Sequence, residues 1–126
     1  MQFSVGPWVY NSSIQAICRR LMDIRRNYTR TIISLAREST RTGAPIVRPL
    51  WWVSPRDPVA LTTDSQFLLG DDLLVAPVLE PGSRSRDVYL PKGTWRDETR
   101  GGSYVGPRWL RGYSADLDVL PYFQRV

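Results

Sequence analysis

The alternation of apolar and polar residues is clearest in residues 64–78, where two short apolar runs flank Gly70-Asp71-Asp72. Each run is too short for an ordinary helix and is bounded by residues typical of turns. The pattern therefore predicts two buried strands joined by a tight turn. Pro77 has no N–H to donate to a sheet, so we expect the second run to end at an edge or a bulge. This stretch indicates a β core.

The rest of the C-terminal two-thirds of the chain repeats this pattern. Short apolar runs alternate with segments rich in Gly and Pro, which is typical of an antiparallel sandwich or a barrel-like sheet. Residues 59–63 are an exception and predict one helical turn. We expect strands at residues 46–53, 66–70, 73–79, 86–91, around Trp95, and at 104–110 and 118–126.

The N-terminal third follows a helical period instead. Ser12 and Gln15 fit a capping box, and Gly43 followed by Pro45 provides a C-cap and a stop. At about 100° per residue, arginines gather on one face and apolar side chains on the other. We expect an amphipathic helix, kinked or divided near Asn27. The arginines are Arg19, Arg26, Arg30, Arg37 and Arg41, and the apolar residues are Ile14, Ile17, Leu21, Ile24, Tyr28, Ile32 and Leu35.

The two helix faces raise separate questions. The arginine face is either a phosphate-binding ridge or a solvated surface, and the solvated surface is favoured because no base-reading residues interleave with the arginines. The apolar face requires a partner. Residues 1–5 predict one short strand ended by Gly6-Pro7, and one strand with one helix cannot close a barrel. We therefore expect the partner to lie outside this chain.

Composition narrows the function classes. A chain of 126 residues with 42% hydrophobic and 23% charged residues is typical of one globular domain. No apolar run approaches the ~18 residues of a membrane span, and no signal pattern follows Met1. The net charge is +5, but the basic residues, nearly all of them arginine, are scattered along the chain, which does not favour nucleic-acid binding. Histidine is absent and Cys18 is alone, so neither a metal site nor a disulfide is predicted.

Three phrases carry a resemblance to a known family. Together with residues 64–78, Gly43-Ala-Pro-Ile-Val-Arg-Pro-Leu-Trp51 and Arg86-Asp-Val-Tyr-Leu-Pro-Lys-Gly-Thr-Trp95 resemble the family-31 glycoside hydrolases, the α-glucosidase and α-galactosidase family. Residues 1–4 and 117–123 are most similar to its myogenesis-regulating glycosidase branch. The resemblance covers nearly the whole chain but only the C-terminal portion of such an enzyme.

The resemblance implies a fold in two parts. Residues 1–43 would be the C-terminal end of a TIM barrel, its strand 8 and helix 8, and residues 44–126 an antiparallel β-sandwich domain. Residues 1–5 correspond to an internal segment in the family, so Met1 is not expected to be the true start.

The resemblance also implies an α-glycosidase that hydrolyses O-glycosyl bonds with retention, in carbohydrate metabolism, without metal or organic cofactor. The family's catalytic aspartates lie on earlier barrel strands, and no position here matches them, so we expect this fragment alone to be inactive. The substrate would be an α-glucoside or an α-galactoside. The alternative is a non-catalytic carbohydrate-binding or interaction module.

The acidic residues of the chain do not form an evident catalytic pair. Retaining glycosidases require two carboxyl groups about 5 to 5.5 Å apart. Asp71 and Asp72 are adjacent, so they point apart and fit a turn better than a catalytic pair. Asp116 and Asp118 share a face if the chain is extended there, yet nothing marks a pocket around them.

The resemblance implies functional positions in this chain only at the rim of the active site. Where α-glucosidase members end the last barrel strand with a sugar-contacting arginine and histidine, this chain has Gln2 and Ser4, followed by Trp8. That departure favours a different sugar, such as an α-galactoside. Trp8 either stacks on a sugar or packs the turn between strand and helix.

Other aromatic and polar residues leave alternatives open. Four tryptophans of the β region form either a sugar-stacking platform or, as favoured here, packing within the sheet. Asn11 and Asn27 begin glycosylation acceptor patterns, which slightly favours the lumen of the secretory pathway or the extracellular space. The tryptophans are Trp51, Trp52, Trp95 and Trp109.

Overall fold

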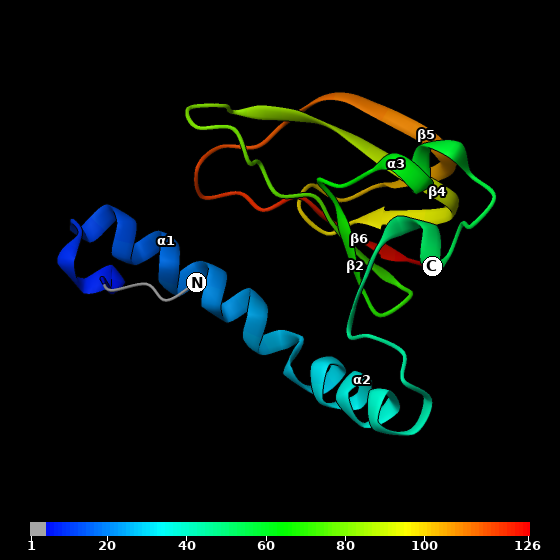
Figure 1. Ribbon diagram of the computed structural model, residues 1–126. Helices are drawn as coiled ribbons and strands as arrows, with labels where there is room; N and C mark the ends of the chain where they lie inside the picture. The colour runs from blue at the N-terminus through cyan, green and yellow to red at the C-terminus, as the bar shows by residue number, and fades with distance from the viewer. Residues whose placement is uncertain (1–4) are drawn as a thin grey trace.

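The computed structural model describes residues 5–126, with a pair of helices beside an antiparallel β domain (Figure 1). The strand expected at residues 1–5 falls almost wholly outside the described residues. The helical part contains η1 (Pro7–Val9), α1 (Ser12–Asn27) and α2 (Thr29–Thr42). The β domain contains β1 (Val47–Arg48), η2 (Leu50–Trp52), α3 (Pro58–Thr62), β2 (Phe67–Leu69), β3 (Leu73–Val75), β4 (Ser85–Asp97), β5 (Ser103–Ser114) and β6 (Tyr122–Arg125).

The predicted helix is confirmed, including its division, because Tyr28 leaves helical geometry between α1 and α2. Its predicted C-cap is also confirmed, since Gly43 adopts a left-handed conformation with φ 76°. The predicted capping box is wrong. Asn11 is the N-cap, and its Oδ1 accepts from Ile14 N at 3.0 Å. Asparagine caps a helix at least as well as serine, and a cap at Asn11 moves Gln15 out of the capping-box position.

The antiparallel β class is confirmed. All six strands join one antiparallel sheet in the order β1-β2-β3-β6-β4-β5. Only the end of the long β4, from Trp95 to Asp97, pairs with β6. Its first half instead lies across the core from β2, where the Gln66 amide bonds both backbone groups of Tyr89 at 2.8 Å. The sheet is therefore bent into two layers that remain one hydrogen-bonded sheet.

Three predicted strands differ from the structure, for local reasons. Residues 46–53 give only the short β1, because Pro49 has no N–H and the chain then turns into η2. The separate strand around Trp95 is instead the end of β4, which continues past Pro91 through a shift in register. Residues 118–121 are not extended, and β6 begins only after Pro121.

The fully buried apolar side chains all belong to the β domain. Trp95 is the largest of them, and its indole nitrogen donates to the carbonyl of Pro91 at 2.8 Å. None of the residues of α1 and α2, all of which the structure describes, is fully buried. The central side chains are Leu50, Leu68, Leu74, Val88, Leu90, Trp95 and Phe123.

The apolar face of the helices does meet a partner within the chain, contrary to our expectation. The rings of Tyr28 and Tyr122 pack edge to face, with centroids 6.1 Å apart. Leu35 lies against Gly70, where an added Cβ would come within 2.9 Å of Leu35 and the φ of 64° already favours glycine. A cavity of about 170 Å³ remains between this face and strands β2, β3 and β6. The contact is therefore loose.

Candidate functional site

Asp71 and Asp72 occupy the turn between β2 and β3, as predicted. The Asp71 carboxylate accepts from Arg48 Nη1 at 2.6 Å. The backbone carbonyl of Asp72 accepts from Arg125 N at 2.7 Å, which joins the turn to the end of β6. Both side chains are exposed. Their role in this structure is to close a hairpin.

Arg48 is a central polar residue that is not among the site residues predicted from the sequence. It is only 3% exposed, and it also donates to the carbonyl of Pro45 at 2.7 Å and to Glu38 of α2 at 3.2 Å. Burial by itself lowers the pKa of Arg48, but the bonds and charges of Asp71 and Glu38 outweigh it and raise that pKa. In the sequence, its position within a run of apolar residues is the feature that indicates a buried arginine. Arg48 joins α2 to the sheet.

Two further aspartates hold tyrosine hydroxyls. Asp57 caps α3 and accepts from Tyr89 Oη at 2.5 Å, and burial together with this bond raises the pKa of Tyr89 to about 12. Asp97, 1% exposed, accepts from Tyr113 Oη at 2.8 Å and from the backbone N–H of Arg100 at 2.9 Å. Burial is the larger of two causes that raise the pKa of Tyr113, and the hydrogen bond and charge of Asp97 are the other. Both carboxylates are occupied by structural bonds.

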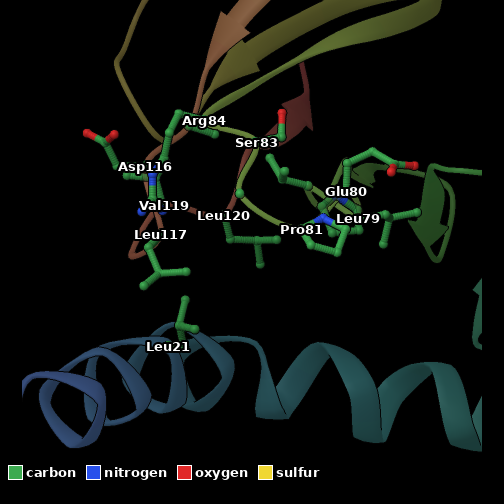
Figure 2. A pocket seen from close by; sticks show the side chains of 14 residues that line it. Leu21, Leu79, Glu80, Pro81, Ser83, Arg84, Asp116, Leu117, Val119 and Leu120 are labelled. Atoms are coloured by element: carbon green, nitrogen blue, oxygen red, sulfur yellow. The ribbon is translucent and has the colours of Figure 1, made fainter. Parts of the chain in front are cut away.

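Asp116 and Asp118 lie in a turn and not on an extended strand, because Val119 N donates to the Asp116 carbonyl at 2.9 Å. Asp118 pairs with Arg20 of α1 at 2.6 Å. Asp116 borders a cavity of about 360 Å³ between α1 and two loops of the β domain, and Leu21 projects from α1 toward Leu117 across it (Figure 2). The lining is mostly apolar, and it presents no facing pair of aspartates.

No catalytic pair or metal centre is assembled in the part of the chain that the structure describes. Within residues 5–126, no group of three or more His, Cys, Asp or Glu side chains is placed to hold a metal ion. No described helix is both long and apolar enough to cross a membrane. Cys18 is a half-buried free thiol.

Of the three predicted rim residues, Gln2 and Ser4 lie outside the described residues. Trp8 is 76% exposed and sits on η1. Its position is defined by Gln15, whose side-chain amide donates to the carbonyls of Trp8 and Tyr10 at 3.4 and 2.9 Å. Trp8 is therefore presented to solvent at the start of α1, where it is available for stacking.

The four tryptophans of the β domain separate into two classes. Trp95 is fully buried, and Trp109 packs on Tyr89 with ring centroids 5.1 Å apart. Packing is thus the role of these two. Trp51 and Trp52 on η2 are 42% and 39% exposed. The sequence held no signal for this difference, because exposure depends on how the sheet bends.

Comparison with known proteins identifies the β domain. Residues 43–126 match the glycosyl hydrolase family 31 C-terminal domain. The mouse (Mus musculus) myogenesis-regulating glycosidase is 49% identical over 98% of this chain and 17% of its own length. The SITS-binding protein of Tetronarce californica is 38% identical over 99% of this chain and 18% of its own.

Solved structures agree with this match. A family-31 α-xylosidase from a soil metagenome, complexed with xylose, superposes with a TM-score of 0.90 at 33% identity, over 99% of this chain and 18% of that one. A Flavobacterium johnsoniae family-31 dextranase, complexed with isomaltotriose, gives 0.91 at 35% identity, over 97% of this chain and 15% of that one.

The chain spans less than a fifth of the length of the two curated relatives above. Within that span, sequence and fold agree from α1 to β6. The chain belongs to glycosyl hydrolase family 31 and carries the C-terminal domain of that family.

Proposed function

We propose that this chain is the C-terminal part of an α-glycosidase that hydrolyses O-glycosyl bonds with retention, and that the catalytic aspartates come from outside residues 1–126. The match of residues 43–126 to the family's C-terminal domain carries this proposal. The side-chain bonds support it. Asp57, Asp71 and Asp97 each hold part of the fold together, through capping, turn closure or a tyrosine pair.

In this proposal, residues 1–43 are the last strand and helix of a TIM barrel, and residues 44–126 are the domain behind it. The loose packing of α1 and α2 supports the division, because a helix with no fully buried residue has surface left for further contacts. Arg48 would then fix the barrel helix to the C-terminal domain through Glu38. The role of residues 44–126 is to brace the end of the barrel.

The proposed substrate is an α-glucoside or an α-galactoside, with Gln2, Ser4 and Trp8 at the rim of the site. The exposure of Trp8 supports a stacking role. Structural relatives include proteins complexed with xylose and with isomaltotriose, which supports a carbohydrate ligand. No metal or organic cofactor is part of the proposal.

A secretory-lumen or extracellular setting is proposed with it. Asn11 and Asn27 are both exposed, at the two ends of α1, which is compatible with an attached glycan. Treating the protein expressed in eukaryotic cells with an endoglycosidase tests this. A mass decrease that Asn11→Gln and Asn27→Gln together remove is expected, and an unchanged mass contradicts the assignment.

The central experiment compares the purified 126-residue chain with the complete natural protein that contains it. We expect the complete protein to cleave a nitrophenyl α-glucoside or α-galactoside with retention, and the 126-residue chain to show no turnover. Turnover by the isolated chain that Asp71→Asn abolishes would contradict the proposal, because it would place the nucleophile in the hairpin turn.

A further inference from the structure

Trp51 and Trp52 form an aromatic surface that the core does not need. They are adjacent on η2 and 42% and 39% exposed, whereas Trp95 is fully buried. Exposed tryptophans are costly to solubility and are enriched where proteins bind ligands. The core beneath them is closed by Leu50 of the same turn, which is fully buried. Within residues 5–126, these two side chains are therefore open to solvent.

Contacts within the chain fix the backbone of the pair and one of its two rings. In η2, Trp52 N donates to the Pro49 carbonyl at 3.0 Å, and Val53 N donates to Leu50 at 3.3 Å. The guanidinium carbon of Arg48 lies 5.5 Å from the centre of the Trp52 ring. Arg48 is itself fixed by Asp71, Glu38 and the Pro45 carbonyl. A platform fixed before binding loses little conformational entropy on binding.

The ring geometry indicates the shape of the ligand. The ring centroids of Trp51 and Trp52 are 6.2 Å apart, and the planes are inclined by 43°. The electron-rich face of an aromatic ring attracts the slightly positive C–H groups on the flat face of a pyranose. Two rings at this separation suit two successive sugars, and their inclination suits a chain that curves from one sugar to the next. An α-linked glucan curves in this way, whereas a β-1,4-linked chain is nearly straight.

We propose that Trp51 and Trp52 form a surface binding site for an α-linked oligosaccharide, separate from the rim residue Trp8 at the start of α1. The choice of an α-linked chain rests on the function proposed above; the existence of the platform does not. Such a site would hold a longer substrate chain on the C-terminal domain, away from the reacting bond. It would raise the local concentration of substrate without taking part in catalysis.

The test uses the 126-residue chain and maltopentaose, followed by isothermal titration calorimetry and by heteronuclear NMR of the indole N–H signals. We expect a dissociation constant on the order of 1 mM, with shifts of the Trp51 and Trp52 signals. Trp51→Ala and Trp52→Ala should each weaken binding at least about tenfold. Trp51→Tyr, which keeps an aromatic face, should retain most of the affinity of the original chain. Tyr10→Ala, which removes an exposed aromatic ring that belongs to neither proposed sugar site, is the matched control and should leave the affinity unchanged.

Cellopentaose, which is β-1,4-linked, should bind several times more weakly than maltopentaose. Circular dichroism shows whether each variant keeps the fold. The inference is overturned if maltopentaose does not bind, if both alanine variants bind as the original chain does, or if Tyr10→Ala weakens binding to the same extent as they do. Turnover by the complete protein reports on the proposed function independently, since it can persist when this site is lost.

Discussion

The helical pair and the β domain differ in how completely they bury their apolar residues. α1 and α2 carry a clear apolar face, yet none of their residues is fully buried. The β domain has much shorter apolar runs, and it buries Trp95, Phe123 and Leu74 completely. An amphipathic pattern identifies the side of an element that will be covered. It does not say how completely the rest of the same chain covers it.

The same two regions also differ in net charge. In residues 1–43, seven arginines stand against Asp23 and Glu38, which accounts for the whole net charge of +5. Residues 44–126 contain ten basic and ten acidic residues. Most described ion pairs that involve the β domain lie within it, and only Arg20–Asp118 and Glu38–Arg48 join the helices to it. The helical pair thus contacts the β domain at few points.

The largest expected difference between the regions concerns two tryptophans. Trp95→Ala removes a fully buried ring and should lower the free energy of unfolding by about 3 to 5 kcal/mol. Trp8→Ala removes a ring that is 76% exposed and should cost less than about 0.5 kcal/mol. Urea unfolding followed by circular dichroism measures both. Similar losses in the two variants would contradict the contrast between the regions.

Alkaline pH should act on the β domain through Tyr89 and Tyr113. Each has a folded-state pKa raised above the ordinary value of 10.0, to about 12 for Tyr89. A raised pKa means that folding favours the neutral hydroxyl. The corresponding stability is fully present below pH 10 and is lost as the pH rises through 12. For Tyr89 we expect a loss of up to about 2 kcal/mol between these values.

Tyr89→Phe is the check on this pH dependence. It removes the bond to Asp57, so it should lower the free energy of unfolding by about 1 kcal/mol at pH 7 and flatten the loss between pH 10 and 12. Thermal unfolding over this pH range provides the measurement. A variant whose pH dependence equals that of the original chain would show that Tyr89 titrates alike in the folded and unfolded states.

Arg48→Met tests the joint between the regions. Its partners Asp71 and Glu38 are 52% and 39% exposed, so water replaces part of the lost interaction. We expect a loss of about 1 to 2 kcal/mol, less than for a fully buried pair. Arg56→Met is the matched control, since Arg56 is exposed and makes no ion pair within residues 5–126. Equal urea midpoints for the two variants would contradict the role given to Arg48.

Arg20→Ala should have the smallest effect. The pair of Arg20 with Asp118 joins α1 to the β domain, but the side chains are 60% and 37% exposed. We expect a change below about 0.5 kcal/mol, and none at high salt. A larger, salt-independent loss in chemical unfolding would show that α1 is held more firmly than its packing indicates.

Features encoded by neighbouring residues could be predicted from the sequence. The turn at Gly70-Asp71-Asp72, the C-cap at Gly43 and the division of the helix near Asn27 all depend on local chemistry. The capping box was wrong by one residue, because Asn11 competes with Ser12 for the same role. Pro49 lies inside the predicted strand at residues 46–53, but β1 ends before it because proline has no N–H to donate.

Features that depend on distant residues could not be predicted. Gln66 and Tyr89 meet only because β4 folds over β2, and Arg48 is buried only because α2 brings Glu38 to it. The same holds for the candidate binding surface. Trp51 and Trp52 stand in an apolar run of the sequence and yet are exposed, whereas Trp95 has polar neighbours in the sequence and is fully buried. Only the bent sheet determines which of these tryptophans meet solvent.

Amide hydrogen exchange on the 126-residue chain tests the contrast between the regions most directly. Amides of β3, β4 and β6 should exchange only through global unfolding, because these strands surround the buried core. Amides of α1 should exchange at least about a hundredfold faster through local opening, since its packing is loose. Protection of α1 equal to that of β4 would contradict the account, because the helix would then share the core of the β domain.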